Sequence, residues 1–187
     1  MMRRSARLAQ RLLLWIGLAA LAYAGGTTAY AGIFQRYQLW KFERNETQTP
    51  TFKIELQDGD LVGKLEIPRI DISVMVLQGT GDYALAFGAG HVSGTPLPGT
   101  EGNVAIAAHR DTYFRNLKEI RRGDSIRYST VRRSYEYVVA SMETVDPDNT
   151  QILESHIRPE LTLITCFPFY YVGSSPKRFV VHAVLLR

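Results

Sequence analysis

The chain has 187 residues, of which 45% are hydrophobic and 21% charged, and its formal net charge is +4. This length allows one domain with a substantial core, and the composition is that of an ordinary globular protein. The excess of positive charge is local, because residues 1–11 contain no acid and four arginines: Arg3, Arg4, Arg7 and Arg11. Without these four, 18 basic residues stand against 18 acidic ones. The rest of the chain is therefore balanced, and we expect no nucleic-acid partner.

A long apolar run follows this basic segment. From Leu12 to Phe34 no residue is charged over 23 positions. About 20 helical residues cross the hydrocarbon layer of a membrane, so we predict a transmembrane anchor over residues 12–34. The positive-inside rule places residues 1–11 in the cytoplasm and the remainder on the extracytoplasmic side of the cell membrane. Small-residue patterns at 22–24 and 29–31 also fit signal-peptidase sites, so cleavage of this helix stays open.

The remainder divides into a linker and a β-rich domain. Residues 35–60 are polar and mixed, and the stretch NETQTP predicts a linker. From Leu61 onward short runs of β-branched residues alternate with Gly and Pro, which predicts strands. We expect strands within these ranges: 61–70, 72–79, 103–109, 125–145 (two strands), 160–166 and 177–186.

Helices are few in this domain. Short helical stretches are predicted over 82–90 and 113–120, and a single turn over 150–154. The Gly- and Pro-rich residues 90–103, GHVSGTPLPGTEGN, predict a loop. Many short strands with two or three small helices favour a compact β-barrel or β-sandwich over residues 61–187.

Three reactive residue types fall at the ends of predicted strands. Cys166, the only cysteine, is followed by Phe167-Pro168, and a proline cannot continue a strand ladder. Arg178 lies at the start of the last strand, so the two share one rim if these strands are antiparallel neighbours. His109 ends the strand NVAIAAH. Strand ends are where a rigid scaffold presents catalytic groups to solvent.

These side chains match the parts of an acyl-transfer site. A cysteine thiolate is a nucleophile, an imidazole transfers protons, and an arginine stabilises an oxyanion. Each also has a structural interpretation: a lone cysteine is often inert in a core, and a histidine or arginine is often an ordinary surface residue. The single cysteine excludes an internal disulfide and a zinc site built on several cysteines. Spacing alone leaves the choice open.

The amino-acid sequences of two segments resemble those of a known family. TLITC followed by PKRF on the next strand resembles the TLxTC-to-Arg pattern of the sortases, and AAHRDTYFRNLKEIRRGD resembles the segment around their catalytic histidine. The resemblance runs from about Leu61 to Arg187 and is greatest to class D sortases. It implies a mostly β fold, a closed eight-stranded barrel with a few short helices, preceded by the membrane helix.

The resemblance also implies a reaction. Cys166 matches the nucleophile, His109 the general acid and base, and Arg178 the residue that holds the oxyanion and the substrate. Thr165 would lie in the same pocket and contact the substrate. The expected partners are surface or pilin proteins with an LPxTG-like sorting signal, cleaved after its threonine, and an amine acceptor from a cell-wall precursor or a pilin lysine. Phe167 stands where many relatives have tyrosine, and we expect no cofactor or metal.

Three other interpretations of these residues exist. A papain-like protease needs a helix directly after its cysteine, and Pro168 does not allow one. An L,D-transpeptidase carries its histidine and cysteine in one short stretch, whereas His109 and Cys166 are 57 positions apart. The remaining alternative is a membrane-tethered, non-catalytic β-barrel that binds peptides.

Overall fold

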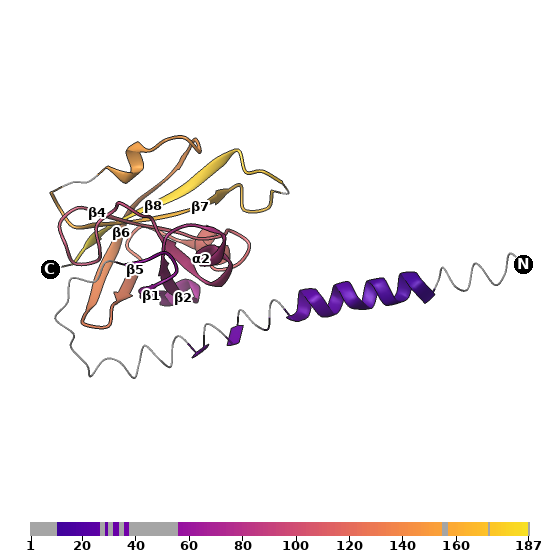
Figure 1. Ribbon diagram of the computed structural model, residues 1–187. Coiled ribbons are helices and arrows are strands. Elements are labelled where there is room, and N and C mark those ends of the chain that lie inside the picture. The colour runs from indigo at the N-terminus through magenta and orange to yellow at the C-terminus, as the bar shows by residue number, and fades with distance from the viewer. Residues whose placement is uncertain are drawn as a thin grey trace, which may run out of the picture.

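The computed structural model describes residues 11–26, 29, 32–33, 36–37, 56–154, 157–171 and 173–186. Residues 11–26 form a helix, drawn in indigo in Figure 1. Within the described residues, no helix has both the length and the apolar character needed to cross a membrane. The anchor predicted over 12–34 and the linker predicted over 35–60 each include positions that lie outside the described residues.

The rest of the described chain consists of short strands and single helical turns. The eight strands are β1 (Leu61–Ile67), β2 (Ile72–Gln78), β3 (Ala89–His91), β4 (Asn103–Ala107), β5 (Ser125–Ser129), β6 (Ser134–Val145), β7 (Glu160–Phe167) and β8 (Lys177–Leu185). The helical elements among them are η1 (Pro68–Ile70), α2 (Asp82–Phe87), η2 (Arg115–Glu119) and η3 (Gln151–Leu153).

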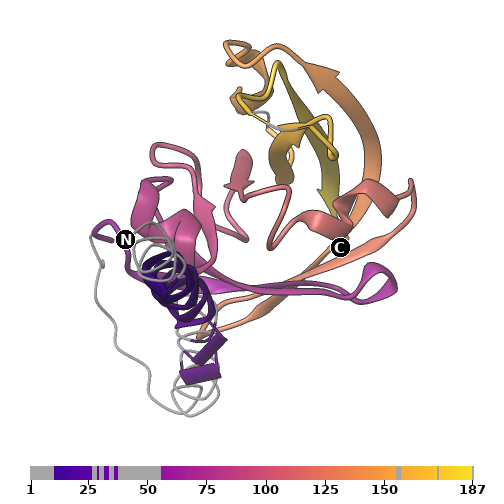
Figure 2. The ribbon, with the colours of Figure 1, turned by 90° about the vertical axis from the view of Figure 1, so that its right-hand side faces the viewer.

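The strands close into a barrel in the order β1-β2-β3-β4-β7-β8-β6-β5. This confirms the predicted eight-stranded barrel and decides against a sandwich. Most neighbours are antiparallel, but β2 pairs with β3 and β4 pairs with β7 in parallel. Figure 1 shows β7 and β8 crossing the upper part of the barrel, and Figure 2 shows β6 (orange) curving beside β8 (yellow).

Alternate residues of the three strands β4, β7 and β8 point into the core. The buried core includes Val104 and Ile106 of β4, Leu161 and Leu163 of β7, and Val181 of β8. Because successive side chains in a strand point to opposite faces, the positions between them lie on the outer face of the barrel wall. Val180 of β8 lies on that outer face and is nevertheless fully buried, so other segments cover this part of the wall.

Two expectations from the sequence were wrong in detail. The sequence predicts a helix over 82–90 and a loop over 90–103, but residues 89–91 form strand β3 between β2 and β4. Ala-Gly-His carries no β-branched signal, and Gly90 is needed there, since a Cβ atom would lie 2.3 Å from the Gly79 carbonyl oxygen. The helix expected over 113–120 is the short 3-10 segment η2, because its backbone hydrogen bonds connect residues three positions apart, such as the Leu117 amide and the Phe114 carbonyl oxygen.

Candidate active site

Strand register brings His109 beside Cys166. The parallel pair β4–β7 aligns each residue with the one 57 positions later, from Asn103 with Glu160 to Ala107 with Ile164. His109 and Cys166 are separated by the same 57 positions. The alignment continues past the end of β4, because the Ala108 amide donates a hydrogen bond of 3.1 Å to the Ile164 carbonyl oxygen. His109, two residues past the end of β4, therefore continues the register that aligns β4 with β7 and corresponds to Cys166 on β7.

Arg178 lies on the other side of Cys166. In the antiparallel pair β7–β8, Cys166 and Arg178 are direct Cα partners, and Phe167 pairs with Lys177. The predicted antiparallel arrangement is therefore present, and the pair lies where β7 ends and β8 begins. His109, Cys166 and Arg178 thus occupy one end of three adjacent strands, β4, β7 and β8.

The same strand alternation places Cys166 and Arg178 on the outer face of the barrel. Leu163 of β7 and Val181 of β8 point into the core, so Cys166 and Arg178, at odd separations from them, point outward. Cys166 and Arg178 are half-buried, and His109 is exposed. The thiol is therefore not a core residue, and a substrate can reach it.

None of the three groups is neutralised by a protein partner. Within the described part of the chain, the Cys166 thiol and the His109 imidazole form no hydrogen bond, either with each other or with another residue. Arg178 donates only to two backbone carbonyl oxygens, those of Ser175 at 3.4 Å and Lys177 at 3.2 Å. Its remaining donors face no described carboxylate, which leaves the guanidinium able to bind an incoming oxygen.

Thr165 has a different position from the one expected of a substrate contact. It is buried on the inner side of β7, and its hydroxyl donates a 2.7 Å hydrogen bond to the Ala108 carbonyl oxygen. This bond fastens the residue before His109 to the residue before Cys166. Thr165 thus supports the alignment of the two, and its predicted contact with substrate stays a prediction.

Arg110 is the residue that sequence reasoning missed. Its guanidinium donates to the β7–β8 connection at four points: the carbonyl oxygens of Pro168 (3.0 Å), Tyr171 (2.6 Å) and Gly173 (3.3 Å) and the Ser175 hydroxyl (2.9 Å). It also lies 5.9 Å from the centroid of the Tyr171 ring. Because Arg110 follows His109 directly, it ties the histidine segment to the loop that joins Cys166 to Arg178. The only signal in the sequence is an arginine immediately after the histidine.

Aromatic side chains form the base of this loop. The Phe167 ring stacks on Phe179 at 6.2 Å and meets Phe169 edge-on at 6.0 Å, and Phe169 packs against Phe179 at 5.4 Å. The Phe167–Pro168 peptide bond is cis. Phe167 therefore serves as an apolar contact in this cluster.

The other histidines belong to different surroundings. His91 is buried at the end of β3, with ring nitrogens 2.9 Å from Gln78 Oε1 and 2.9 Å from the Pro96 carbonyl oxygen. His182 lies on β8, 2.8 Å from Glu143 Oε1. His156 is outside the described residues. Neither described histidine is placed with Cys166.

Comparison with known proteins identifies the family. The family model described as "Sortase domain" matches residues 65–186, which is most of the barrel. The chain belongs to the sortase family. Its members are cysteine transpeptidases, and the expected eight-stranded sortase barrel with few short helices is confirmed.

Individual sortases show how far the similarity extends. Sortase D of Bacillus subtilis is 35% identical over 127 residues, which cover 67% of this chain and 64% of the relative. Sortase A of Bacillus anthracis is 29% identical over 163 residues, covering 79% of this chain and 76% of the relative. The structure of a Clostridium perfringens Sortase D5 transpeptidase has the same fold, with a TM-score of 0.74 at 24% identity, covering 82% of this chain and 99% of that one. The predicted resemblance to the sortases, and to class D among them, is confirmed.

Proposed function

We propose that this protein is a membrane-anchored cysteine transpeptidase that cleaves an LPxTG-like C-terminal sorting signal after its threonine and transfers the cleaved protein to an amine. The observation that carries the proposal is the placement of Cys166, His109 and Arg178 at one end of three adjacent strands, with Cys166 and Arg178 on the outer face of the barrel. A nucleophile, a proton-transfer group and a fixed cation at one exposed strand end are the parts that acyl transfer requires.

The first half of the reaction uses all three residues. The Cys166 thiolate attacks the threonine carbonyl carbon, and an electron pair of its sulfur forms the new C–S bond. Arg178 donates to the carbonyl oxygen as it becomes negative, and it remains charged at any working pH. His109 gives a proton to the departing amine, so the C–N bond breaks and a thioester remains on Cys166.

The second half reverses these roles. An amine from a cell-wall precursor or a pilin lysine attacks the thioester carbonyl. His109 accepts the proton that the amine loses, and the C–S bond breaks as the electron pair returns to the Cys166 sulfur. The product is a surface or pilin protein joined to its acceptor through an amide bond.

A fluorogenic LPxTG-type peptide, offered with and without an amine acceptor, tests the activity. Cleavage should fall by about three orders of magnitude or more in Cys166→Ala, because no other cysteine exists to replace the nucleophile. Circular dichroism checks that the variant is folded. If wild type and variant bind the peptide by fluorescence anisotropy but neither cleaves it, the barrel is a non-catalytic peptide-binding domain.

The proposed location rests on the N-terminal sequence. An uncharged run over residues 12–34 after four arginines supports a single-pass anchor with the barrel on the extracytoplasmic side of the cell membrane. Single cysteines introduced as Thr51→Cys and Lys118→Cys in the Cys166→Ala background provide the test. Both should react with an impermeant maleimide in intact cells. Labelling that needs cell lysis would reverse the proposed orientation.

A further inference from the structure

A hollow beside the β7–β8 connection has no role in the steps above. It has a volume of about 280 Å³ and is lined by Arg110, Asp111, Arg115, Lys118, Phe169 and Tyr170. Its lining comes from the two segments that carry the catalytic groups. Arg110 and Asp111 directly follow His109, and Phe169 and Tyr170 follow Cys166 after three and four positions. The hollow is therefore formed by the two chain segments that lead on from His109 and from Cys166.

The charge of this hollow is positive. Three cations, Arg110, Arg115 and Lys118, stand against the single carboxylate of Asp111. Among the ion pairs of the described residues, none includes any of these three cations. A concave surface with charges of one sign in excess attracts counter-charged ligands more strongly than scattered surface charges do.

Two of these cations keep donors for a ligand. Arg115 donates through Nε to the Asp111 carbonyl oxygen at 3.0 Å, and this bond holds the side chain while its terminal nitrogens donate to no described residue. Lys118 donates to the Tyr170 hydroxyl at 2.7 Å and lies 5.0 Å from the centroid of that ring, which leaves further N–H donors. Arg110 differs, because its guanidinium is occupied by the β7–β8 connection.

We propose that this hollow binds an anionic group, a carboxylate or a phosphate, that the amine acceptor carries. The inference rests on the proposed transpeptidation, in which the acceptor nitrogen reaches the thioester at Cys166 and gives a proton to His109. The rest of the acceptor must then extend away from that point, and the segments that lead on from both residues form the hollow. Arg115 and Lys118 supply charge-assisted hydrogen bonds to the anion, and Phe169 and Tyr170 supply an apolar wall for the connecting atoms.

Matched acceptors test the preference for an anion. We would compare glycine peptides of one to three residues that end in a carboxylate with the same peptides as amides, and phosphoethanolamine with ethanolamine. Within each pair the amine is primary in both members, and rates are compared per concentration of unprotonated amine, because the anion also changes the basicity of the amine. The anionic member should have a kcat/KM about three- to tenfold higher, and the advantage should shrink with added salt. The two pairs distinguish a carboxylate-bearing acceptor from a phosphate-bearing one.

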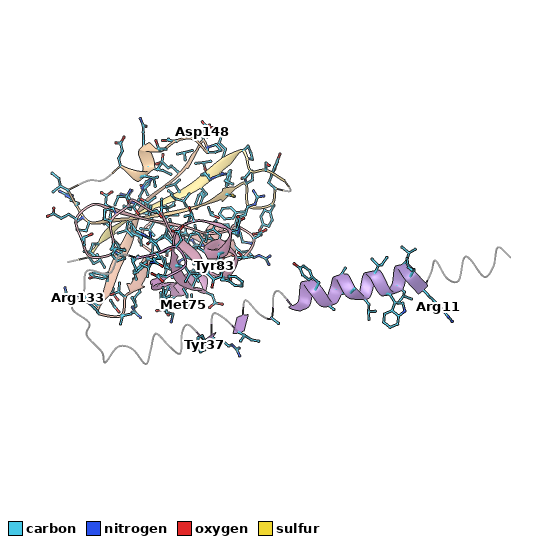
Figure 3. All side chains as sticks on the ribbon, in the orientation of Figure 1. Arg11, Tyr37, Met75, Tyr83, Arg133 and Asp148 are labelled. Carbon is cyan, nitrogen blue, oxygen red and sulfur yellow. The ribbon has the colours of Figure 1, made fainter. Side chains whose placement is uncertain are left out.

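Two variants connect this preference with the hollow. The double variant Arg115→Gln/Lys118→Gln removes both available cations and should bring the ratio between anionic and neutral acceptors close to one. Arg133→Gln removes an exposed arginine from the β5–β6 turn, labelled at the lower left of Figure 3, and should keep the wild-type ratio. Because the ratio compares two acceptors within one variant, a general loss of folded enzyme changes neither conclusion.

A titration with inorganic phosphate gives a readout that needs no turnover. Amide signals of residues 110–118 should shift in NMR spectra of the wild type and not in those of the double variant. If peptide cleavage proceeds but no acceptor pair shows a preference, the anion site is wrong and the transpeptidase proposal stands. If the peptide is not cleaved, the proposed function fails; shifts with phosphate would then leave an anion site without an acceptor role, and their absence would overturn both.

Discussion

The two ends of the wall formed by β4, β7 and β8 carry similar polar side chains, which are hydrogen-bonded within the protein at one end and without described partners at the other. One end is where β4 and β7 begin and β8 finishes. There, Thr162 donates at 2.7 Å to Asn103 Oδ1, Asn103 donates at 2.8 Å to the Ile152 carbonyl oxygen, and His182 lies 2.8 Å from Glu143 Oε1. At the other end, the Cys166 thiol and the His109 imidazole have no described partner. Thr162 and Cys166 are four positions apart on β7, or about 13 Å.

This contrast separates supporting polar groups from reactive ones. Hollows of similar volume lie at both ends, about 270 Å³ beside His182 and about 280 Å³ beside Arg110. A hydrogen-bonding group whose donors and acceptors are already paired within the protein stabilises the fold, whereas an accessible group that lacks a partner can react with a substrate. A hollow and a histidine are therefore insufficient to identify the catalytic end, and the state of the hydrogen bonds identifies it.

Replacing His109 or His182, one at a time, should give the largest difference in activity between the two ends. His109→Gln should lower kcat/KM for peptide cleavage by about 10²- to 10⁴-fold, because it removes the proton-transfer group, with little change in thermal stability. His182→Gln should keep kcat/KM within about threefold and lower stability by about 1 kcal/mol, since it disturbs a hydrogen-bond network. Peptide kinetics and thermal unfolding of both variants provide the test. A greater loss of activity in His182→Gln than in His109→Gln would reverse the comparison.

A smaller effect on activity is expected for Arg110, whose hydrogen bonds hold the β7–β8 connection at the catalytic end. Arg110→Lys replaces a planar fork by one ammonium group, which cannot reach all four acceptors in the β7–β8 connection. We expect kcat/KM for peptide cleavage to fall about tenfold, mainly through KM, as the loop loosens.

The loop itself supplies a second readout for this variant. Chymotrypsin should cut after the exposed Tyr170 faster in Arg110→Lys than in the wild type. Arg133→Gln, remote from the loop, is the control. Unchanged cleavage by chymotrypsin together with unchanged KM would show that Arg110 does not position the loop.

The buried His91 extends the comparison to pH. Burial is the main cause that lowers its pKa below the ordinary histidine value, and the hydrogen bond to the Pro96 carbonyl oxygen opposes this in part. The unfolded chain then binds more protons than the native state, so stability falls as the pH drops below about 6.5 and levels off below the folded-state pKa. The melting temperature of His91→Gln should therefore change less between pH 7 and pH 5 than that of the wild type. Parallel slopes for the two proteins would contradict this.

The smallest effect is expected at Tyr128. This residue shows that a polar group without a hydrogen-bond partner is reactive only if a substrate can reach it. Its hydroxyl has no hydrogen-bond partner among the described residues, yet the side chain is fully buried and no substrate reaches it. Burial also raises the pKa of this phenol, so it stays neutral. Tyr128→Phe should leave peptide cleavage unchanged and alter stability by about 1 kcal/mol or less, in the stabilising direction, as measured by urea unfolding. A clear loss of stability would reveal a partner for this hydroxyl.

The sequence predicted the individual strands better than their pairing. Pro168 and the apolar runs placed Cys166, His109 and Arg178 at strand ends, and seven of the eight strands were expected close to their positions. The parallel pairing of β4 with β7 joins residues 57 positions apart, and no local pattern reveals such a register. Strand β3 was missed because pairing on both sides, rather than propensity, makes Ala89–His91 a strand.

The role of Arg110 lay beyond the sequence for a similar reason. An arginine after a histidine has the pattern of an ordinary surface charge. Its four acceptors are three backbone carbonyl oxygens and one hydroxyl, located 58 to 65 positions further along the chain. Backbone acceptors carry no mark in the sequence, so only the folded loop brings them together.

The most direct test of the account is to trap the intermediate on Cys166. The protein is mixed with excess LPxTG-type peptide without an amine acceptor, quenched with acid, and analysed by intact mass spectrometry and peptide mapping. We expect an adduct with the mass of the peptide up to its threonine, attached to Cys166 and released by hydroxylamine, and none in Cys166→Ala. Cleavage of the peptide without such an adduct, or with an adduct on another residue, would contradict a thioester mechanism.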